Sequence, residues 1–283
     1  MAQYVLTMSC PDRTGIVAAI TNFIAGRDGS IIEAAHFVDA FSDRSFMRTT
    51  FRGETLPDLA DLRRQFDEVA TTFRMEWNIF TADRKCKTLL AVSKQGHCLN
   101  SLLHRWSIGT LPIEITGVVS NHDTHRRLTE WYGLPFHHYP IEEGRKLDQE
   151  ARILQLFETT RSDLLVLARY MQVLSDDACR SLSGRCINIH HSFLPGFKGA
   201  KPYHQAYARG VKIIGATAHY ATGDLDEGPI IEQDVQRVDH TMLPDDLVEI
   251  GHDLEAVVLN RAVRWHAEHR VFVTDNRTIV LHS

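Results

Sequence analysis

The chain has 283 residues, of which 43% are hydrophobic and 24% are charged, a composition typical of folded globular proteins. Its net charge of −5 argues against nucleic-acid and membrane partners, and no apolar run approaches the roughly 18 residues of a membrane span, so we expect a cytoplasmic protein. The five cysteines are scattered and form no Cys-x-x-Cys pair, which predicts buried free thiols rather than disulfides or a zinc site.

The basic residues divide the chain into two parts. Residues 1–84 contain nine arginines and no lysine, whereas all seven lysines lie from Lys85 onward. The hydrophobic periodicity changes at the same place. We therefore predict two domains, residues 1–84 and residues 85–283.

The first domain alternates strand and helix patterns in the order βαββαβ. A strand at residues 4–8 precedes a helix that Asp12 or Thr14 would cap and that Gly26 and Gly29 would end. The apolar face of this helix is Val17, Ile20, Phe23 and Ile24. A hairpin of residues 31–41 and 45–51, a helix at 59–73 and a strand at 75–80 follow. This order defines the ferredoxin-like arrangement, which by itself indicates no function.

The turn at residues 10–16 joins the first strand to the first helix. Free backbone N–H groups at a helix start can receive an anion, but a capped turn without a ligand is the commoner explanation. The run Pro11-Asp12-Arg13-Thr14-Gly15-Ile16, together with the βαββαβ order, resembles the ACT domain, a regulatory amino-acid-binding module. The resemblance implies an effector site at Asp12, Arg13, Thr14, Gly15 and Ile16, with methionine and glycine as candidate ligands, and association into a homo-oligomer.

The second domain alternates short strands with helices from Thr88 onward. The strands are predicted at 88–92, 114–120, 136–139 and 164–168, and the helices at 97–106, 124–132 and 146–159. This alternation predicts a doubly wound, mostly parallel sheet whose ligands bind at the carboxyl ends of the strands. The motifs G-x-G-x-x-G, G-x-x-x-x-G-K-[ST], H-E-x-x-H and G-x-S-x-G are missing, so a dinucleotide, ATP, a catalytic zinc or a serine nucleophile elbow is not indicated.

Polar side chains interrupt the next apolar strand, at residues 186–189. Asn188 and His190 are two residues apart, so they lie on the same face and emerge together at the carboxyl end of the strand. A buried amide without a hydrogen bond costs about 1–3 kcal/mol, which favours a ligand-facing role. A satisfied core amide followed by a capped turn is the alternative.

The acidic loop at residues 223–229 follows a strand at 214–220 and precedes another at 230–233. Asp224, Asp226 and Glu227 lack EF-hand spacing, and a solvated turn is the simple interpretation. If the loop folds over the strand that carries His190, one carboxylate would pair with this histidine. Such a pair stabilises an imidazolium, which is suited to stabilising an oxyanion.

The segment Asn188-Ile189-His190-x-Ser192-x-Leu194-Pro195, with His219 and Leu225-Asp226-x-Gly228-Pro229 downstream, resembles the formyltransferase-fold family that uses 10-formyltetrahydrofolate. The resemblance extends over residues 88–236 and implies that Asn188, His190 and Asp226 form a catalytic triad. Residues 163–174 resemble the pterin-binding segment of the family. The implied substrate-binding residues are Met171, Gln172, Val173, Leu174, His191, His219 and Leu225.

An ACT-like front joined to this catalytic half resembles the hydrolytic members of the family, which release tetrahydrofolate and formate and so supply formate for one-carbon metabolism and purine synthesis. The resemblance implies a folate substrate, water, and no metal or organic cofactor. The transformylases of the family carry proline at the position of His191. In this chain, His191 either positions water or merely fills the place of that proline. Which group is the general base is open, because coupled His and Asp titrations belong to the pair.

Two other functions remain compatible with the sequence. One is a formyltransferase that passes the group to an amine acceptor, and the other is a catalytically silent folate sensor.

Two supporting segments complete the chain. Lys198 and Lys201, in a glycine-bearing loop, are candidates to attract the glutamate tail of folate. Residues 243–269 form an amphipathic helix with core packing as its expected role, with a stripe of Leu247, Ile250, Leu254, Val258 and Ala262.

Overall fold

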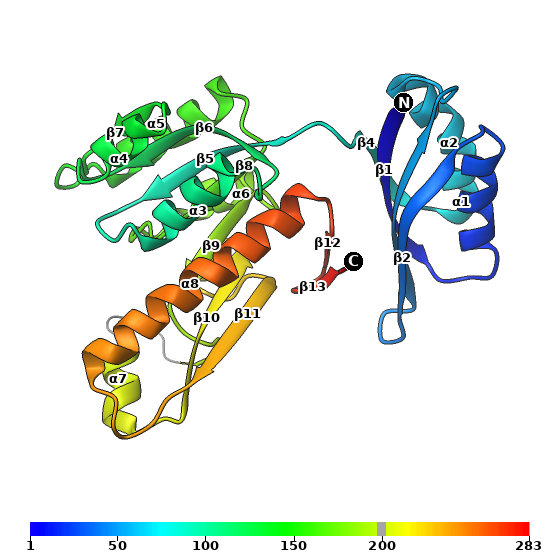
Figure 1. Cartoon of the computed structure of the whole chain (residues 1–283). Helices are drawn as coiled ribbons and strands as arrows, with labels where there is room; N and C mark the ends of the chain where they lie inside the picture. The colour runs from blue at the N-terminus through cyan, green and yellow to red at the C-terminus, as the bar shows by residue number, and fades with distance from the viewer. Residues whose placement is uncertain (197–201, 283) are drawn as a thin grey trace. The chain divides into compact units, whose positions relative to one another are not determined.

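The computed structural model describes residues 1–196 and 202–282, which divide into two compact units (Figure 1). The first unit contains Met1–Arg84, His269–Thr274 and the residues from Ile279 on, and the second contains Lys85–Glu268 and Asp275–Thr278. The division at Lys85 coincides with the change in lysine content. The loop with Lys198 and Lys201 lies outside the described residues.

Most residues after 268 group with the first unit. The predicted domain of residues 85–283 would have placed them with residues 85–268. The reason is local packing and charge. Arg270, 8% exposed, places Nη1 2.9 Å from Glu33 Oε1, and the rings of Phe272 and Phe46 lie 5.7 Å apart. A side chain's partners in space, rather than its position along the chain, decide this grouping.

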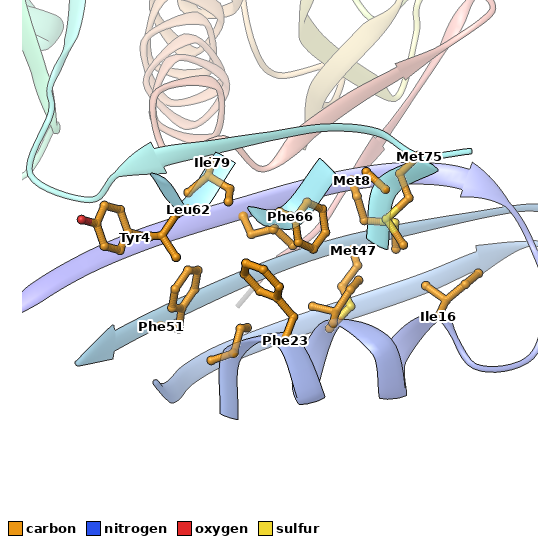
Figure 2. Packing of buried hydrophobic residues seen from close by; sticks show 14 of the residues in the cluster. Tyr4, Met8, Ile16, Phe23, Met47, Phe51, Leu62, Phe66, Met75 and Ile79 are labelled. Atoms are coloured by element: carbon orange, nitrogen blue, oxygen red, sulfur yellow. The ribbon is translucent and has the colours of Figure 1, made fainter. Parts of the chain in front are cut away.

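The first unit is a four-stranded antiparallel sheet in the order β2-β3-β1-β4, with two helices. Its elements follow the order βαββαβ: β1 Ala2–Pro11, α1 Ile16–Ala25, β2 Ser30–Asp39, β3 Arg44–Gly53, α2 Leu59–Phe73 and β4 Glu76–Thr81. Alternate residues of β1 point to the helices, so the buried face carries Tyr4, Leu6, Met8 and Cys10. Figure 2 shows Phe23 of α1 and Phe66 of α2 meeting this face, with ring centroids 5.0 Å apart.

The start of α1 differs from the prediction. Gly15 is its N-cap, with φ of 99°, and no side chain caps the helix, so neither Asp12 nor Thr14 has the expected role. Asp12 instead accepts a hydrogen bond from Ser45 Oγ on β3. Val17 is 40% exposed, and the buried face consists of Ile16, Ile20, Phe23 and Ile24, because the 3.6-residue period places residue 16 rather than 17 toward the sheet.

The second unit contains a seven-stranded mixed sheet in the order β11-β10-β9-β8-β5-β6-β7. Strands β9, β8, β5, β6 and β7 are parallel, and β10 and β11 add an antiparallel edge. The strands are β5 Cys86–Val92, β6 Ile113–Ser120, β7 Phe136–His138, β8 Leu164–Leu167, β9 Cys186–His190, β10 Ile213–Tyr220 and β11 Ile230–Arg237. The helices are α3 His97–Ser107, α4 Arg126–Trp131, α5 Lys146–Thr159, α6 Asp176–Ser181, α7 Pro202–Arg209 and α8 Pro244–Ala267.

Both faces of this sheet are covered. Ile153 and Phe157 of α5 pack on one face, against Leu89, Leu165 and neighbouring residues. Leu90 and Val166, which alternate with them, are fully buried on the other face. The carboxyl ends of the parallel strands therefore form the open edge at which ligands of such sheets bind.

Helix α8 packs along β9, β10 and β11 (Figure 1). Leu247, Leu254, Val258 and Ala262 are buried as expected, whereas Ile250 is only half-buried. This helix is the longest at 24 residues, but no helix within the described part of the chain is both long and apolar enough to cross a membrane. The periodicity did not predict α6, β12 Val271–Thr274 or β13 Arg277–Val280, which have only four to six residues each.

All five cysteines are buried and free, as their scattered positions predicted. Burial raises the pKa of the Cys186 thiol, so it stays protonated and acts as a small apolar side chain.

Candidate active site

The carboxyl end of β9 carries Asn188 and His190, whose side chains share one face of the strand. Strand β10 pairs antiparallel with β9 and sets His219 directly opposite Asn188. This register brings Asn188 Nδ2 within 3.2 Å of His219 Nε2. The side chain of Asn188, which the sequence left without a partner, therefore gains one from the neighbouring strand.

The turn after β9 is held by Thr217, which lies opposite His190 in the same pairing. Its hydroxyl donates to the carbonyl of Ser192 at 2.9 Å and accepts from the backbone N–H of Leu194 at 3.1 Å. The Ser192 hydroxyl in turn lies 2.8 Å from His190 Nε2. Side-chain hydrogen bonds thus replace the strand ladder where the backbone leaves the sheet.

The acidic loop folds over this end of β9 because Gly228 allows a close backbone approach. A Cβ at Gly228 would lie 1.8 Å from the carbonyl oxygen of Tyr220. The Tyr220 N–H donates to the Pro229 carbonyl at 3.0 Å, which closes the loop. Asp226, at a φ of 58°, then extends Oδ2 to within 3.2 Å of His190 Nδ1, with a side chain that is 10% exposed.

Asp226 is a carboxylate at neutral pH. Burial raises its pKa, but hydrogen bonds and charge from His190 and His219 outweigh burial and hold the pKa well below its usual range. His219 Nδ1 lies 2.9 Å from the Tyr220 carbonyl, so that nitrogen carries the hydrogen. His219 Nε2 lies 3.2 Å from Asn188 Nδ2 and 3.7 Å from Asp226 Oδ1. The amide of Asn188 keeps a second hydrogen for a ligand.

A cavity of about 210 Å³ opens beside these groups. The ten residues that the sequence suggested for catalysis and substrate binding all line it: Met171, Gln172, Val173, Leu174, Asn188, His190, His191, His219, Leu225 and Asp226. Met171, Val173 and Leu225 are 54%, 50% and 59% exposed, which places apolar surface at its entrance. The tertiary structure thus brings four separate segments of the chain to one site.

A buried charged cluster behind the cavity was not predicted. Glu255 of α8 is fully buried, with its carboxylate 2.7 Å from His97 Nε2, 2.8 Å from the Tyr203 hydroxyl and 3.3 Å from Arg169 Nε. Its pKa lies below the usual value because His97, Arg169 and Tyr203 outweigh the effect of burial. One signal was present in the sequence: Glu255 lies within the apolar stripe of α8, four residues after Gly251 and three before Val258.

The residues His97, Cys98 and Glu255 are the one group, within residues 1–196 and 202–282, whose ligand atoms are close enough to share a metal ion. The Arg169 guanidinium beside Glu255 already supplies the positive charge that this carboxylate needs. The donor set therefore fits an ion-pair cluster better than a cation site.

The turn at residues 12–16 exposes Asp12, Arg13 and Thr14 and buries Ile16. The Arg13 guanidinium lies 4.3 Å from the ring centroid of Phe73 and donates to the Thr72 carbonyl. The amino end of α1 keeps its backbone N–H groups without a side-chain cap.

Comparison with known proteins places both units of the chain in one family. The family described as formyl transferase matches residues 86–263, more than half of the chain. A formyltetrahydrofolate deformylase of Corynebacterium sp. (strain P-1) is 54% identical over 280 residues, which cover 99% of this chain and 98% of the relative. The crystal structure of a formyltetrahydrofolate deformylase from Burkholderia mallei ATCC 23344 has a TM-score of 0.95 at 50% identity and covers 100% of both chains.

The similarity to transferases is more limited. A phosphoribosylglycinamide formyltransferase of Coxiella burnetii is 29% identical with a TM-score of 0.66, and the match covers 70% of this chain and 94% of that one. The match to deformylases, in contrast, extends over the first unit as well. The chain therefore belongs to the formyltetrahydrofolate deformylase family.

Proposed function

We propose that this chain hydrolyses 10-formyltetrahydrofolate to tetrahydrofolate and formate, with Asn188, His190 and Asp226 as its catalytic residues. The family membership supports the reaction. The observation that carries the catalytic roles is the 3.2 Å contact of Asp226 with His190 beside a cavity whose wall is residues 171–174.

Water adds to the formyl carbon, and the carbonyl oxygen becomes an oxyanion. Asn188 donates its second amide hydrogen to this oxygen, and protonated His190 donates to it from Nε2. In the structure, the Ser192 hydroxyl contacts the same Nε2. Asp226 orients His190 and stabilises its positive charge. Losing one oxyanion donor typically costs about a hundredfold or more in kcat. The proposed reaction uses these side chains and water, without a metal or an organic cofactor.

The apolar residues at the entrance hold the flat pterin ring. Met171, Val173 and Leu225 supply surface for stacking. The Met171 N–H already donates to Ser93 Oγ at 2.9 Å, so the other backbone groups of residues 171–174 offer hydrogen bonds to the ring edge. His219 acts indirectly, because it fixes the amide orientation of Asn188.

Formate release without any amine acceptor tests the reaction itself. Hydrolysis predicts stoichiometric formate and tetrahydrofolate from 10-formyltetrahydrofolate and enzyme alone. A transferase would require an added amine, and a folate sensor would bind the substrate without turnover.

Asp226→Asn and His190→Ala test the catalytic roles. Each is expected to lower kcat by about a hundredfold or more while tetrahydrofolate binding changes little. Asp224→Asn, an exposed carboxylate in the same loop, is the matched control and is expected to keep wild-type turnover. Wild-type turnover in Asp226→Asn would reject the assignment.

For the first unit, we propose an ACT-type regulatory domain that binds an amino acid at residues 12–16. The βαββαβ order, the exposed side chains of this turn and the uncapped start of α1 support it. Methionine and glycine are the candidate effectors. A change in the rate of formate release on adding methionine or glycine, which Asp12→Ala abolishes, would support the effector site. If neither amino acid changes the rate, the proposed site is rejected.

We also propose that the chain forms a homo-oligomer through β2. This strand is an edge of its sheet, and it exposes apolar side chains, including Ile32, Phe37 and Val38, that are 47%, 42% and 38% exposed. Sedimentation of the wild type and of Phe37→Glu tests the proposal. A wild-type chain that sediments as a monomer would reject it.

A further inference from the structure

His191 follows the catalytic His190 and lines three cavities, two of which concern the reaction. One is the cavity of about 210 Å³ described above, and the other, of about 610 Å³, has several polar side chains in its lining. Both cavities are also bordered by Arg169, Met171 and Gln172, so His191 lies where they adjoin. Its ring centroid is 5.2 Å from that of His190 and 6.4 Å from that of Tyr203.

The imidazole of His191 is half-buried, yet its nitrogens contact no hydrogen-bond partner among the residues that the structure describes. Neither nitrogen belongs to the fully enclosed polar atoms that lack a partner, so both remain accessible. His190 and His219, in contrast, each use both ring nitrogens. His191 is thus the histidine of this site with ring nitrogens open to a small ligand.

The surroundings of His191 keep it neutral. Burial lowers its pKa to about 4, and the charges of Arg169 and His190 act in the same direction. Glu255 and Asp226 oppose the shift, but Glu255 is neutralised by Arg169 and Asp226 by His190. A neutral imidazole keeps one lone-pair nitrogen, which accepts a hydrogen bond from water.

The larger cavity is suited to deliver water. Ser93, Gln95, Asn121 and His122 line it, together with the cationic groups of Lys94 and Arg169. This larger cavity is not bordered by residues 173–174, 188 or 225–226. Folate bound against those residues would therefore leave the larger cavity open to solvent.

We propose that His191 is a catalytic residue that accepts the proton of the attacking water, which enters from this larger cavity; the role rests on the hydrolysis proposed above. The water oxygen bonds to the formyl carbon, its proton passes to His191, and the carbonyl electron pair moves to the oxygen held by Asn188 and His190. The C–N10 bond then breaks, its electron pair stays on N10, and His191 returns the proton to that nitrogen. Formic acid loses its proton to solvent, which leaves formate and tetrahydrofolate.

His191→Ala and His191→Gln test this role, with exposed His240→Ala as the matched control. Both variants are expected to lower kcat for formate release at neutral pH by about a hundredfold or more, with tetrahydrofolate affinity within about threefold of the wild type. Their rates should rise in proportion to hydroxide concentration, because hydroxide needs no base. Glutamine keeps a hydrogen-bond acceptor but cannot take a proton, so it separates proton transfer from water orientation.

Turnover within about threefold of wild type in either variant, or a loss that does not recover at high pH, would overturn the role of His191. His190→Ala distinguishes this failure from failure of the wider proposal. It removes the oxyanion donor, so its rate should stay low at every pH. Wild-type rates in His190→Ala would reject the catalytic set, whatever His191 does.

Discussion

Gly228 determines where Asp226 lies, and Gly228→Ala tests that dependence without changing any catalytic group. The added methyl group would lie 1.8 Å from the Tyr220 carbonyl oxygen and 3.2 Å from His219 Nδ1. Because the carbonyl belongs to β10, at the antiparallel edge of the sheet, the loop rather than the strand is expected to move.

The size of that movement follows from the contact distance. A Cβ almost never approaches another heavy atom closer than 3.0 Å, so the loop must open by about 1.2 Å at Gly228. Asp226 is two residues away, and its contact with His190 is already 3.2 Å long. A displacement of about 1 Å in such a site can cost about a hundredfold in rate, and overpacking typically costs about 1–3 kcal/mol in stability.

Formate release and thermal unfolding of Gly228→Ala measure the two effects. We expect kcat to fall about a hundredfold and the melting temperature to fall by a few degrees. Gly223→Ala is the control in the same loop, since its Cβ would meet only the exposed Asp176 side chain, at 3.1 Å. Turnover of Gly228→Ala within about threefold of wild type would refute the claim that this glycine positions the carboxylate.

Glu255→Gln leaves Arg169 buried with a weaker partner, so urea unfolding should show a loss of about 3–5 kcal/mol, whereas exposed Glu249→Gln on the same helix should change little. The native pKa of Asp226 lies below its unfolded value, so its stabilisation is present above about pH 4 and is lost as the pH falls further. The difference in free energy of unfolding between wild type and Asp226→Asn should therefore shrink between about pH 5 and pH 3; a constant difference would contradict the shift.

The sequence by itself determined strands β1 to β11, the longer helices and the polar residues at the end of one strand. Period-two alternation in β1 and the 3.6-residue period of α8 are local properties of the sequence. They predict these elements because the period decides which side chains are buried. The same-face relation of Asn188 and His190 needs only the geometry of a strand. The sequence predicted a carboxylate partner for His190 only if the acidic loop folds over that strand, because residue spacing does not determine where a loop folds.

Only the tertiary structure decided which side chains meet. The antiparallel pairing of β9 with β10 selects His219 for Asn188 and Thr217 for His190, although the paired residues lie about thirty positions apart along the chain. The absence of a side chain at Gly228 allows Asp226 to reach His190, and α8 brings Glu255 to Arg169. These contacts depend on register and close approach between distant segments, whereas local sequence patterns record only which face of an element is apolar.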